Sequence, residues 1–210
     1  QDKVYINIPE PLGLPITFDN SNVTYDPATF DGTSFEVVAN PAPGGSNNVA
    51  SNVGAVTNSG AAYEGIAFEL GTAIDLSTLG SIKMNFWADA PIDVLMKLEE
   101  GSTSTPDAVV SHGGTGWEEM SFDINSTSTY SKLVIFVDGP GTTTGTFYMD
   151  DITQIETPTP PAPTEPVVGA PVPTQDAANV ISIFSDTYSD LTGTNLDTNW
   201  QGDITSETVT

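Results

Sequence analysis

Short runs of alternating apolar and polar residues recur along most of the chain. In the run SIKMNFWA, every second residue from Ile82 to Phe86 is apolar, and Lys83 and Asn85 lie between them. Similar runs are DVLMKLE, GWEEMSFDI, KLVIFVD and TFYMDDI. Alternation with a period of two residues is typical of a β-strand with one buried face. The pattern therefore predicts a succession of short strands.

The segments between these runs are rich in turn-forming residues. NPAPGGSNN at 40–48 and EEGSTSTPD at 99–107 combine Gly, Pro, Asn and Ser, which end strands. No longer window shows the apolar stripe of an amphipathic helix. The pattern therefore predicts an all-β fold, in which two antiparallel sheets pack as a β-sandwich of the jelly-roll type and bury their apolar faces.

A proline-rich segment divides the chain. Seven prolines lie between Glu156 and Thr174, and this composition favours an extended, semi-rigid spacer over an ordered loop packed on the domain. We therefore expect a β-sandwich module at 1–155 and a Pro/Thr-rich linker at 156–177. The remainder, 178–210, has one strand-like run and is too short to fold alone, so we expect it to begin a second, incomplete β-sandwich module.

The chain has a formal net charge of −24, from 28 acidic residues against four lysines and no arginine. This charge argues against nucleic acid and anionic membrane surfaces as partners, since both need clustered positive charge.

The absence of cysteine excludes disulfides and thiolate metal sites. No apolar run reaches the roughly 18 residues of a transmembrane helix. Because the chain begins at Gln1 without an apolar leader, we expect a secreted or outer-membrane-surface protein whose signal peptide has been removed.

The polar faces of the expected strands carry the candidate ligand-binding residues. Trp87, Lys97 and Trp117 all lie on the face opposite the apolar one, as do Asn85 and Glu99. If their strands share one sheet, flat rings and hydrogen-bonding heads form a single surface. Sugar rings stack on such rings, while amides, lysines and carboxylates bind the hydroxyls. The alternative is that a tryptophan folds over a sheet edge or anchors a loop.

Two further residues are weaker candidates for the same surface. Tyr63 lies in a loop that enters the strand-like run GIAFEL. His112 lies in a Gly-rich loop, five residues before Trp117, and is expected to line the rim of the binding surface.

Evidence for catalysis is weak. Glu99 and Glu119 form the best pair for glycoside hydrolysis, which needs two carboxylates facing each other across a cleft. In a chain with 28 acidic residues, solvated charges on strand faces explain such a pair better. His112 is the only histidine, and there is no Gly-Xaa-Ser-Xaa-Gly motif or phosphate-binding loop. We therefore expect a protein that is not an enzyme.

Two adjacent carboxylates, Asp150 and Asp151, lie at the end of a strand-like run. In a regular strand they point to opposite faces, so one of them faces inward, which is costly for an ionised group without a partner. With few lysines available, a calcium ion bound by oxygen ligands is a better partner, and Asp19 is a plausible second carboxylate. The alternative is that these acids are solvent-exposed at a strand end.

The order of several short motifs resembles a known family. ITFDN, NPAPGGSNN, AAYEGIAFEL, VLMKLEE, GWEEMSFD and GTFYMDDI resemble, in that order, a jelly-roll domain of secreted glycan-utilisation proteins of marine Bacteroidota. There it accompanies glycoside hydrolases or belongs to surface glycan-binding proteins. The resemblance covers most of residues 14–155 and implies polysaccharide binding, with β-glucans such as laminarin as the first ligand to consider. Similar modules keep a structural calcium between the first and last strands, which implies Asp19 and Asp151 as ligands, with Asp150 as the alternative.

The predicted function is that of a non-catalytic carbohydrate-binding module within a multimodular protein, whose partners are a polysaccharide and neighbouring modules of the same polypeptide. Rings stack on the glycan and polar side chains bind its hydroxyls. The alternative function is a structural spacer or adhesion module without a glycan site. The candidate binding residues are Trp87, Trp117, Lys97, Tyr63, His112, Glu99 and Asn85.

Overall fold

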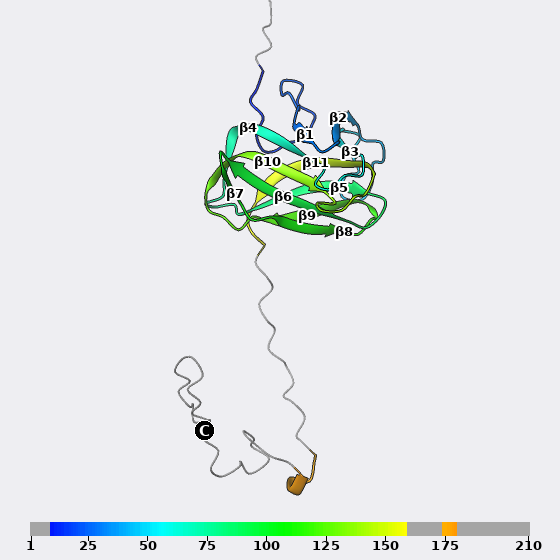
Figure 1. The fold of residues 1–210 in the computed structure, drawn as a ribbon, viewed down its shortest axis with the longest axis vertical. Helices are drawn as coiled ribbons and strands as arrows, with labels where there is room; N and C mark the ends of the chain where they lie inside the picture. The colour runs from blue at the N-terminus through cyan, green and yellow to red at the C-terminus, as the bar shows by residue number, and fades with distance from the viewer. Residues whose placement is uncertain (1–8, 159–173, 180–210) are drawn as a thin grey trace, which may run out of the picture. The chain divides into compact units, whose positions relative to one another are not determined.

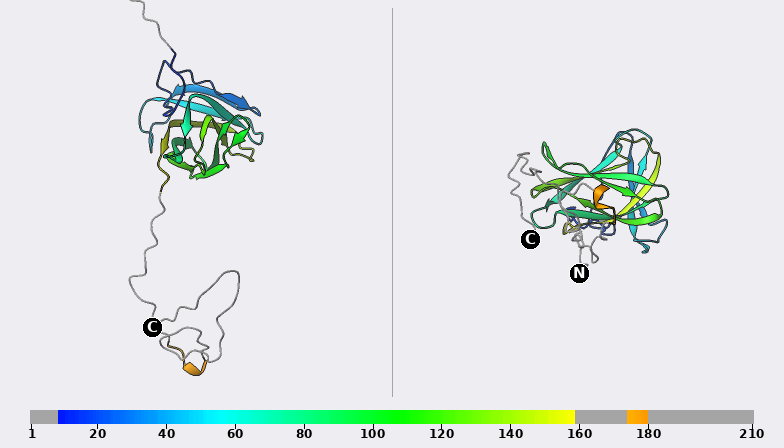
Figure 2. Two further views of the ribbon diagram at one scale, coloured as in Figure 1. Left: turned by 90° about the vertical axis from the view of Figure 1, so that its left-hand side faces the viewer. Right: turned by 90° about the horizontal axis from the view of Figure 1, so that it is seen from below.

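Two antiparallel β-sheets face each other across an apolar interior (Figures 1 and 2). The computed structural model describes residues 9–158 and 174–179. The six-stranded sheet has the order β1-β4-β10-β6-β7, and β8 also pairs with β6. Its strands are β1 (Ala28–Phe30), β4 (Gly65–Asp75), β6 (Ile92–Glu100), β7 (Thr103–Ser104), β8 (Ala108–His112) and β10 (Thr129–Val137).

The five-stranded sheet has the order β2-β3-β11-β5-β9. Its strands are β2 (Ser34–Ala39), β3 (Asn52–Asn58), β5 (Ser81–Ala88), β9 (Gly116–Asp123) and β11 (Gly145–Ile155). The all-β sandwich predicted from the alternating runs is therefore confirmed. The run SIKMNFWA coincides with β5, and the other four runs lie on β6, β9, β10 and β11.

The core consists of the apolar residues that alternate along the strands. Phe86 of β5, Met96 of β6 and Phe122 of β9 are all fully buried between the sheets. The segment before β1 completes this core, since Ile16 is also fully buried and forms an antiparallel bridge with Ile152 of β11. Burying this apolar surface is the main stabilising contribution to the sandwich.

Consecutive strands cross repeatedly between the two sheets. β4 lies in the six-stranded sheet, β5 in the five-stranded sheet, and β6 again in the six-stranded sheet. Each crossing turns the polar face of the next strand toward the opposite side of the molecule. This connectivity decides which polar residues share a surface.

Most of the expected linker and second module, 156–177 and 178–210, lies outside the described residues. Within 174–179 a single turn of 3-10 helix, η1 (Ala177–Asn179), follows Asp176, whose side chain accepts a hydrogen bond from the Ala178 backbone N–H at 3.0 Å. Over the described ranges, no helix has both the length and the apolar character needed to cross a membrane.

Candidate functional site

The outer face of the six-stranded sheet carries an apolar row that crosses five strands. From β1 to β8 in register order, this apolar row consists of Phe30, Gly65, Phe136, Leu95 and Val109. The residues that alternate with them, such as Ile135 and Val94, belong to the core, so the row faces outward. Since neighbouring strands lie about 4.8 Å apart, the row is roughly 19 Å long.

Gly65 lets two aromatic rings meet within this row. A Cβ at this position would lie 2.6 Å from Cδ1 of Phe136 and 2.9 Å from Cε2 of Phe30. The ring centroids of Phe30 and Phe136 are 5.7 Å apart, within the range of favourable aromatic pairs. The missing side chain therefore allows both rings to lie close to the sheet.

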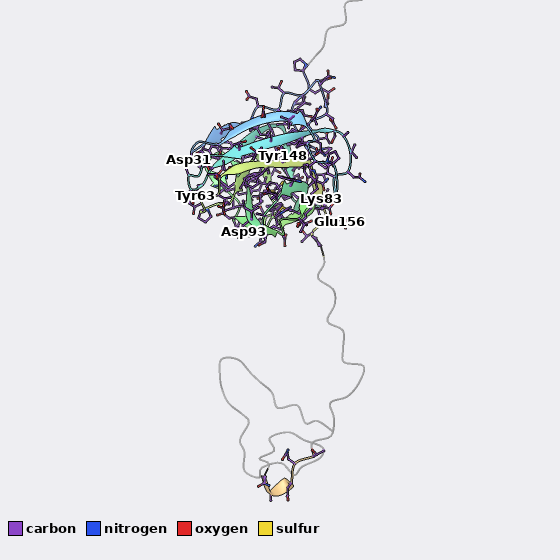
Figure 3. The ribbon with its side chains drawn as sticks, turned by 90° about the vertical axis from the view of Figure 1, so that its right-hand side faces the viewer. Asp31, Tyr63, Lys83, Asp93, Tyr148 and Glu156 are labelled. Carbon is purple, nitrogen blue, oxygen red and sulfur yellow. The ribbon has the colours of Figure 1, made fainter. Side chains whose placement is uncertain are left out.

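Tyr63 adds an exposed ring beside the apolar row. Its side chain is 51% exposed, and its ring meets the Phe136 ring edge-on at a centroid distance of 6.2 Å. Its backbone N–H donates to the carbonyl of Gly139 at 2.7 Å, which ties it to the loop after β10. Figure 3 shows Tyr63 and Asp31 at the same end of the sandwich, away from Lys83. The ring is thus both accessible and held in place.

The Glu64 carboxylate anchors the loop that presents Tyr63. Glu64 is 1% exposed. Its carboxylate accepts hydrogen bonds from the backbone N–H and hydroxyl of Ser59 and from the backbone N–H groups of Gly60 and Ala61, at 2.5–3.1 Å. Burial acts to raise the pKa of Glu64, but these hydrogen bonds outweigh it and lower the pKa. The loop is therefore organised around a buried, ionised carboxylate.

A row of ion pairs runs beside the apolar row. This ion-pair row consists of Glu69 of β4, Lys132 of β10 and Glu99 of β6, which are aligned in register. Nζ of Lys132 lies 2.9 Å from Glu69 and 4.0 Å from Glu99, and Nζ of Lys97 lies 3.1 Å from Glu99. The hydrogen bond that Lys132 donates to Glu69, together with the negative charge of Glu69, raises the pKa of Lys132. The outer face of the six-stranded sheet thus combines aromatic rings with lysine and glutamate side chains that ion pairs hold in place.

The structure brings only some of the predicted binding residues together. Lys97, Glu99 and Tyr63 share the outer face of the six-stranded sheet, whereas Trp87 and Asn85 lie on β5 of the other sheet. The expectation of one surface containing Trp87, Trp117 and Lys97 is therefore wrong. Alternation assigns each residue an inward or outward direction, but it does not say which sheet a strand joins.

Trp117 lies outside the core cluster but is covered by the segment that follows β2. Its side chain is 4% exposed, and Nε1 lies 3.3 Å from Oδ1 of Asn40, to which it donates a hydrogen bond. Its backbone carbonyl accepts a hydrogen bond from Ser46 at 3.2 Å. Trp117 therefore anchors a loop, the alternative left open by the sequence, and offers no exposed ring for stacking.

His112 is also an interior residue rather than part of a rim. It is 2% exposed, and its ring meets the Phe86 ring edge-on at 5.6 Å. Nδ1 accepts a hydrogen bond from the Gly114 N–H at 2.9 Å, and Nε2 lies 3.2 Å from the Phe86 carbonyl. These contacts assign the hydrogen to Nε2 and correct the expectation that His112 meets a ligand.

Trp87 keeps a partly exposed position on the outer face of the five-stranded sheet. Its ring lies 5.3 Å from that of Tyr148 on β11, at an interplanar angle of 61°. Asn85 and Asp151 line an open pocket of about 450 Å³ on the same side. This second aromatic pair is separated from Tyr63 and Phe136 by the thickness of the sandwich.

The carboxylate pair considered for catalysis does not converge. Glu99 lies on the outer face of the six-stranded sheet and Glu119 on that of the five-stranded sheet. Each is paired with a lysine, Glu99 with Lys97 and Glu119 with Lys83 at 2.7 Å. These two residues cannot flank one glycosidic bond.

Asp150 and Asp151 do not point to opposite faces, because β11 is irregular at this point. The pairing of β11 with β5 shifts between Asp150 and Thr153, and Asp151 has a φ of 49°. Such a bulge places two residues opposite one and redirects a side chain. Both carboxylates thus lie on the outer side of the five-stranded sheet, and Ile152 turns into the core.

Asp150 is nevertheless buried, under the loop between β2 and β3. It is 2% exposed, and Oδ2 accepts hydrogen bonds from Asn47 at 2.8 Å and Ser51 at 3.2 Å. Burial raises the pKa of Asp150 to about 6. Asp151 instead is exposed and accepts a hydrogen bond from Asn85 at 3.0 Å.

The calcium expected from the sequence would have to bind at Asp150, since a buried carboxylate without a cationic partner is the kind of group that a bound cation would stabilise. Its neighbours Asn47 and Ser51 face it with an amide N–H and a hydroxyl hydrogen, and so act as hydrogen-bond donors in this structure. Asp19 accepts a hydrogen bond from the Asn52 N–H at 2.8 Å, next to Ser51, so it reaches the same loop end. In the part of the chain that the structure describes, no three acidic or His side chains converge into a metal cluster.

Solved structures that align with part of this chain include carbohydrate-binding modules, although no protein-family model and no curated protein matches the sequence. A family 11 module from Clostridium thermocellum, in complex with a β-1,3-1,4-mixed-linked tetrasaccharide, is 14% identical over 62% of this chain and 88% of the module, with a TM-score of 0.45. A variant of the family 29 module CBM29-2 is 9% identical over 57% of this chain and 90% of its own, with a TM-score of 0.39.

An exo-β-agarase gives a TM-score of 0.53, at 11% identity over 72% of this chain. The aligned segment is 26% of the agarase chain. At this level of identity, the similarity shows a shared fold.

Sequence reasoning missed two central residues of the face, Phe30 and Phe136. Phe136 alternates with Ile135 and Val137, so the period-two pattern in KLVIFVD already places it on the outward face. Phe30 ends a strand of three residues, which is too short for alternation to be recognised.

Proposed function

We propose that this chain binds polysaccharide without cleaving it, on the outer face of the six-stranded sheet. The observation that carries the proposal is the exposed ring of Tyr63 set against Phe136, beside the polar heads of Lys97 and Glu99. Sugar rings present apolar faces that pack on aromatic rings, and their hydroxyls pair with ammonium and carboxylate groups. The ligand then packs on Tyr63 and the partly exposed Phe136, and bonds to the charged groups of Lys97 and Glu99. Leu95 of the apolar row is only 6% exposed and adds little surface to this contact.

The first ligand to test is a β-glucan such as laminarin. A shallow face with few rings binds a single chain weakly, because little surface is removed from water. In a secreted or cell-surface multimodular protein, several modules on one polypeptide would engage the same glycan and raise the overall affinity. Trp87 and Asn85 would then lie on the side away from the ligand.

Calcium is proposed as a structural ion. Asp150 and Asp19 would hold it, with the hydroxyl oxygen of Ser51, and the Asn47 amide would have to turn over, because its Nδ2 now donates to Asp150. A bound cation supplies the positive charge that the buried Asp150 carboxylate lacks. These residues link β11, the segment before β1 and the loop before β3, so the ion would stabilise the sandwich without contacting the glycan.

Affinity electrophoresis of the full chain in gels containing soluble polysaccharides tests the proposed function. The panel includes laminarin, mixed-linkage glucan, xylan and mannan. We expect retardation in at least one gel, lost in Tyr63→Ala and kept in Tyr148→Ala, a matched aromatic change on the other sheet. Absence of retardation in every gel would favour the structural-spacer alternative, and loss in Tyr148→Ala alone would move the site to the five-stranded sheet.

A further inference from the structure

All lysines within the described residues are already paired with carboxylates. Lys83 pairs with Glu119 on the five-stranded sheet. The other two, Lys97 and Lys132, belong to the candidate binding face and pair with Glu99 and Glu69. Because the chain has no arginine, it also lacks the planar fork that best binds carboxylate and sulfate groups. The face therefore holds no unpaired described cation for an anionic ligand.

The candidate face also carries an excess of negative charge. Its strands hold five acidic residues against the two lysines: Glu69, Asp75, Asp93, Glu99 and Glu100. Asp93 is exposed and accepts a hydrogen bond from the Ser111 hydroxyl at 2.6 Å. Asp31 is also exposed and lies at the same end of the sandwich as Tyr63 (Figure 3). A polyanion approaching this face meets repulsion locally, and from the net charge of −24 at longer range.

We propose that the ligand of this face is a neutral polysaccharide, and that the ion-pair row excludes glycans that carry uronic acids or sulfate. The inference rests on the proposed function and names its ligand class. A neutral hydroxyl pairs with a lysine or glutamate head without breaking the ion pair, because an ammonium has three donors and a carboxylate accepts several hydrogen bonds. An anionic group that shares the ammonium lies close to the Glu99 or Glu69 carboxylate and is repelled by it, whereas a neutral hydroxyl is not.

The first experiment compares neutral and anionic glycans for the full wild-type chain. Retardation is measured in gels of laminarin and mixed-linkage glucan, and in gels of alginate and carrageenan, at low and at physiological ionic strength. We expect retardation in a neutral gel only, at both ionic strengths. If alginate or carrageenan retards the chain as much as or more than the neutral glucans do, the proposal of a neutral ligand is wrong, while the proposed polysaccharide binding stands. Absence of retardation in all gels overturns the proposed function itself.

The second experiment releases the two lysines. In Glu69→Gln/Glu99→Gln, Lys97 and Lys132 lose their partners while the side chains keep their size. We expect this variant to gain retardation in alginate or carrageenan, at least severalfold above wild type at low ionic strength, and to lose it as salt screens the charges.

The matched control, Glu36→Gln/Asp123→Asn, removes two exposed charges from the other sheet. An equal gain in this control would assign the exclusion of polyanions to net charge and overturn the role of the ion-pair row. The role of the ion-pair row would also be overturned if Glu69→Gln/Glu99→Gln kept the wild-type melting temperature and gained no retardation in alginate or carrageenan.

Discussion

Nζ of Lys97 lies 5.7 Å from the centroid of the Phe136 ring and 3.1 Å from Oε1 of Glu99. Lys97 of β6 and Phe136 of β10 are diagonal neighbours on adjacent strands, since Lys97 is opposite Val134 and Phe136 is opposite Leu95. The lysine therefore joins the apolar row to the ion-pair row. On the proposed function, this ammonium would be the hydrogen-bond donor for a ligand stacked on the Phe136 ring.

Replacing Lys97 by Met tests this arrangement. Methionine keeps a long apolar side chain and removes the charged head. We expect glycan binding to weaken severalfold, by about 1 kcal/mol, as measured by isothermal titration calorimetry. Because the pair with Glu99 is partly exposed, unfolding in urea is expected to change little. Unchanged affinity in Lys97→Met would contradict a direct role of the ammonium.

Two substitutions at Tyr63 separate the ring from the backbone. Tyr63 has a φ of 59°, a region that glycine adopts without strain and alanine does not. We expect Tyr63→Gly to be more stable to urea than Tyr63→Ala by about 1 kcal/mol, while both variants lose glycan binding equally. If Tyr63→Gly retained binding, the ring would have no part in recognition.

Glu64→Gln is expected to loosen the loop that holds Tyr63. In wild type, the backbone N–H groups of Gly60 and Ala61 donate to the Glu64 carboxylate. The amide of glutamine would place an NH₂ group, which is itself a donor, against some of these donors. Because the pKa of Glu64 is lowered from its usual 4.5 in the folded protein, the carboxylate stabilises the fold above that pH, and this contribution is lost as the pH falls through the folded-state pKa.

Thermal unfolding across this pH range checks the prediction for Glu64. The melting temperature of Glu64→Gln should lie several degrees below that of wild type at neutral pH, and the difference should shrink in acid. A constant difference at all pH values would rule out the ionised carboxylate as its cause.

The contribution of Asp150 to the stability of the fold is expected to depend on pH in the opposite direction to that of Glu64 when calcium is absent. Its pKa is raised from 3.8 to about 6 by burial, so its stabilising contribution is present below pH 3.8 and lost as the pH rises through about 6. In the presence of a chelator, the melting temperature of wild type should therefore fall relative to that of Asp150→Asn as the pH rises from 3.8 to about 6. Added calcium should reverse the effect above pH 6, raising the melting temperature of wild type by several degrees and leaving Asp150→Asn unchanged.

Asp123→Asn is the control for Asp150, because it removes an exposed acid from the same sheet. It should respond to calcium as wild type does. A calcium response that persists in Asp150→Asn would place the ion elsewhere.

Trp117→Phe is expected to affect stability and not binding. The substitution removes the hydrogen bond from Nε1 to Asn40 and leaves a gap under the covering loop, which together cost about 1–3 kcal/mol. Trp87→Phe, at a partly exposed site, should cost less. Urea unfolding and glycan retardation measured side by side distinguish the two effects, and weaker binding in Trp117→Phe at full stability would return this residue to the ligand site.

The positions of the candidate binding residues were predictable to different degrees. Alternation along β6 was enough to direct Lys97 and Glu99 outward, and the structure agrees. The same reasoning directed Trp117 outward but did not foresee that Asn40 and Ser46 would cover it, because a covering loop leaves no periodic signal in the strand below. The bulge in β11 likewise broke the alternation at Asp151, where a positive φ brings both carboxylates to one side.

The sequence by itself determined strands β5, β6, β9, β10 and β11 and the all-β class, since alternation and turn residues act between near neighbours in the chain. Only the tertiary structure decided which strands share a sheet, and with that which outward residues form one surface. β5 and β6 are consecutive in the chain, yet they join different sheets, so Trp87 and Lys97 end on opposite sides of the molecule. Strand pairing depends on partners far away in the sequence, such as β4 with β10, and local periodicity carries no information about them.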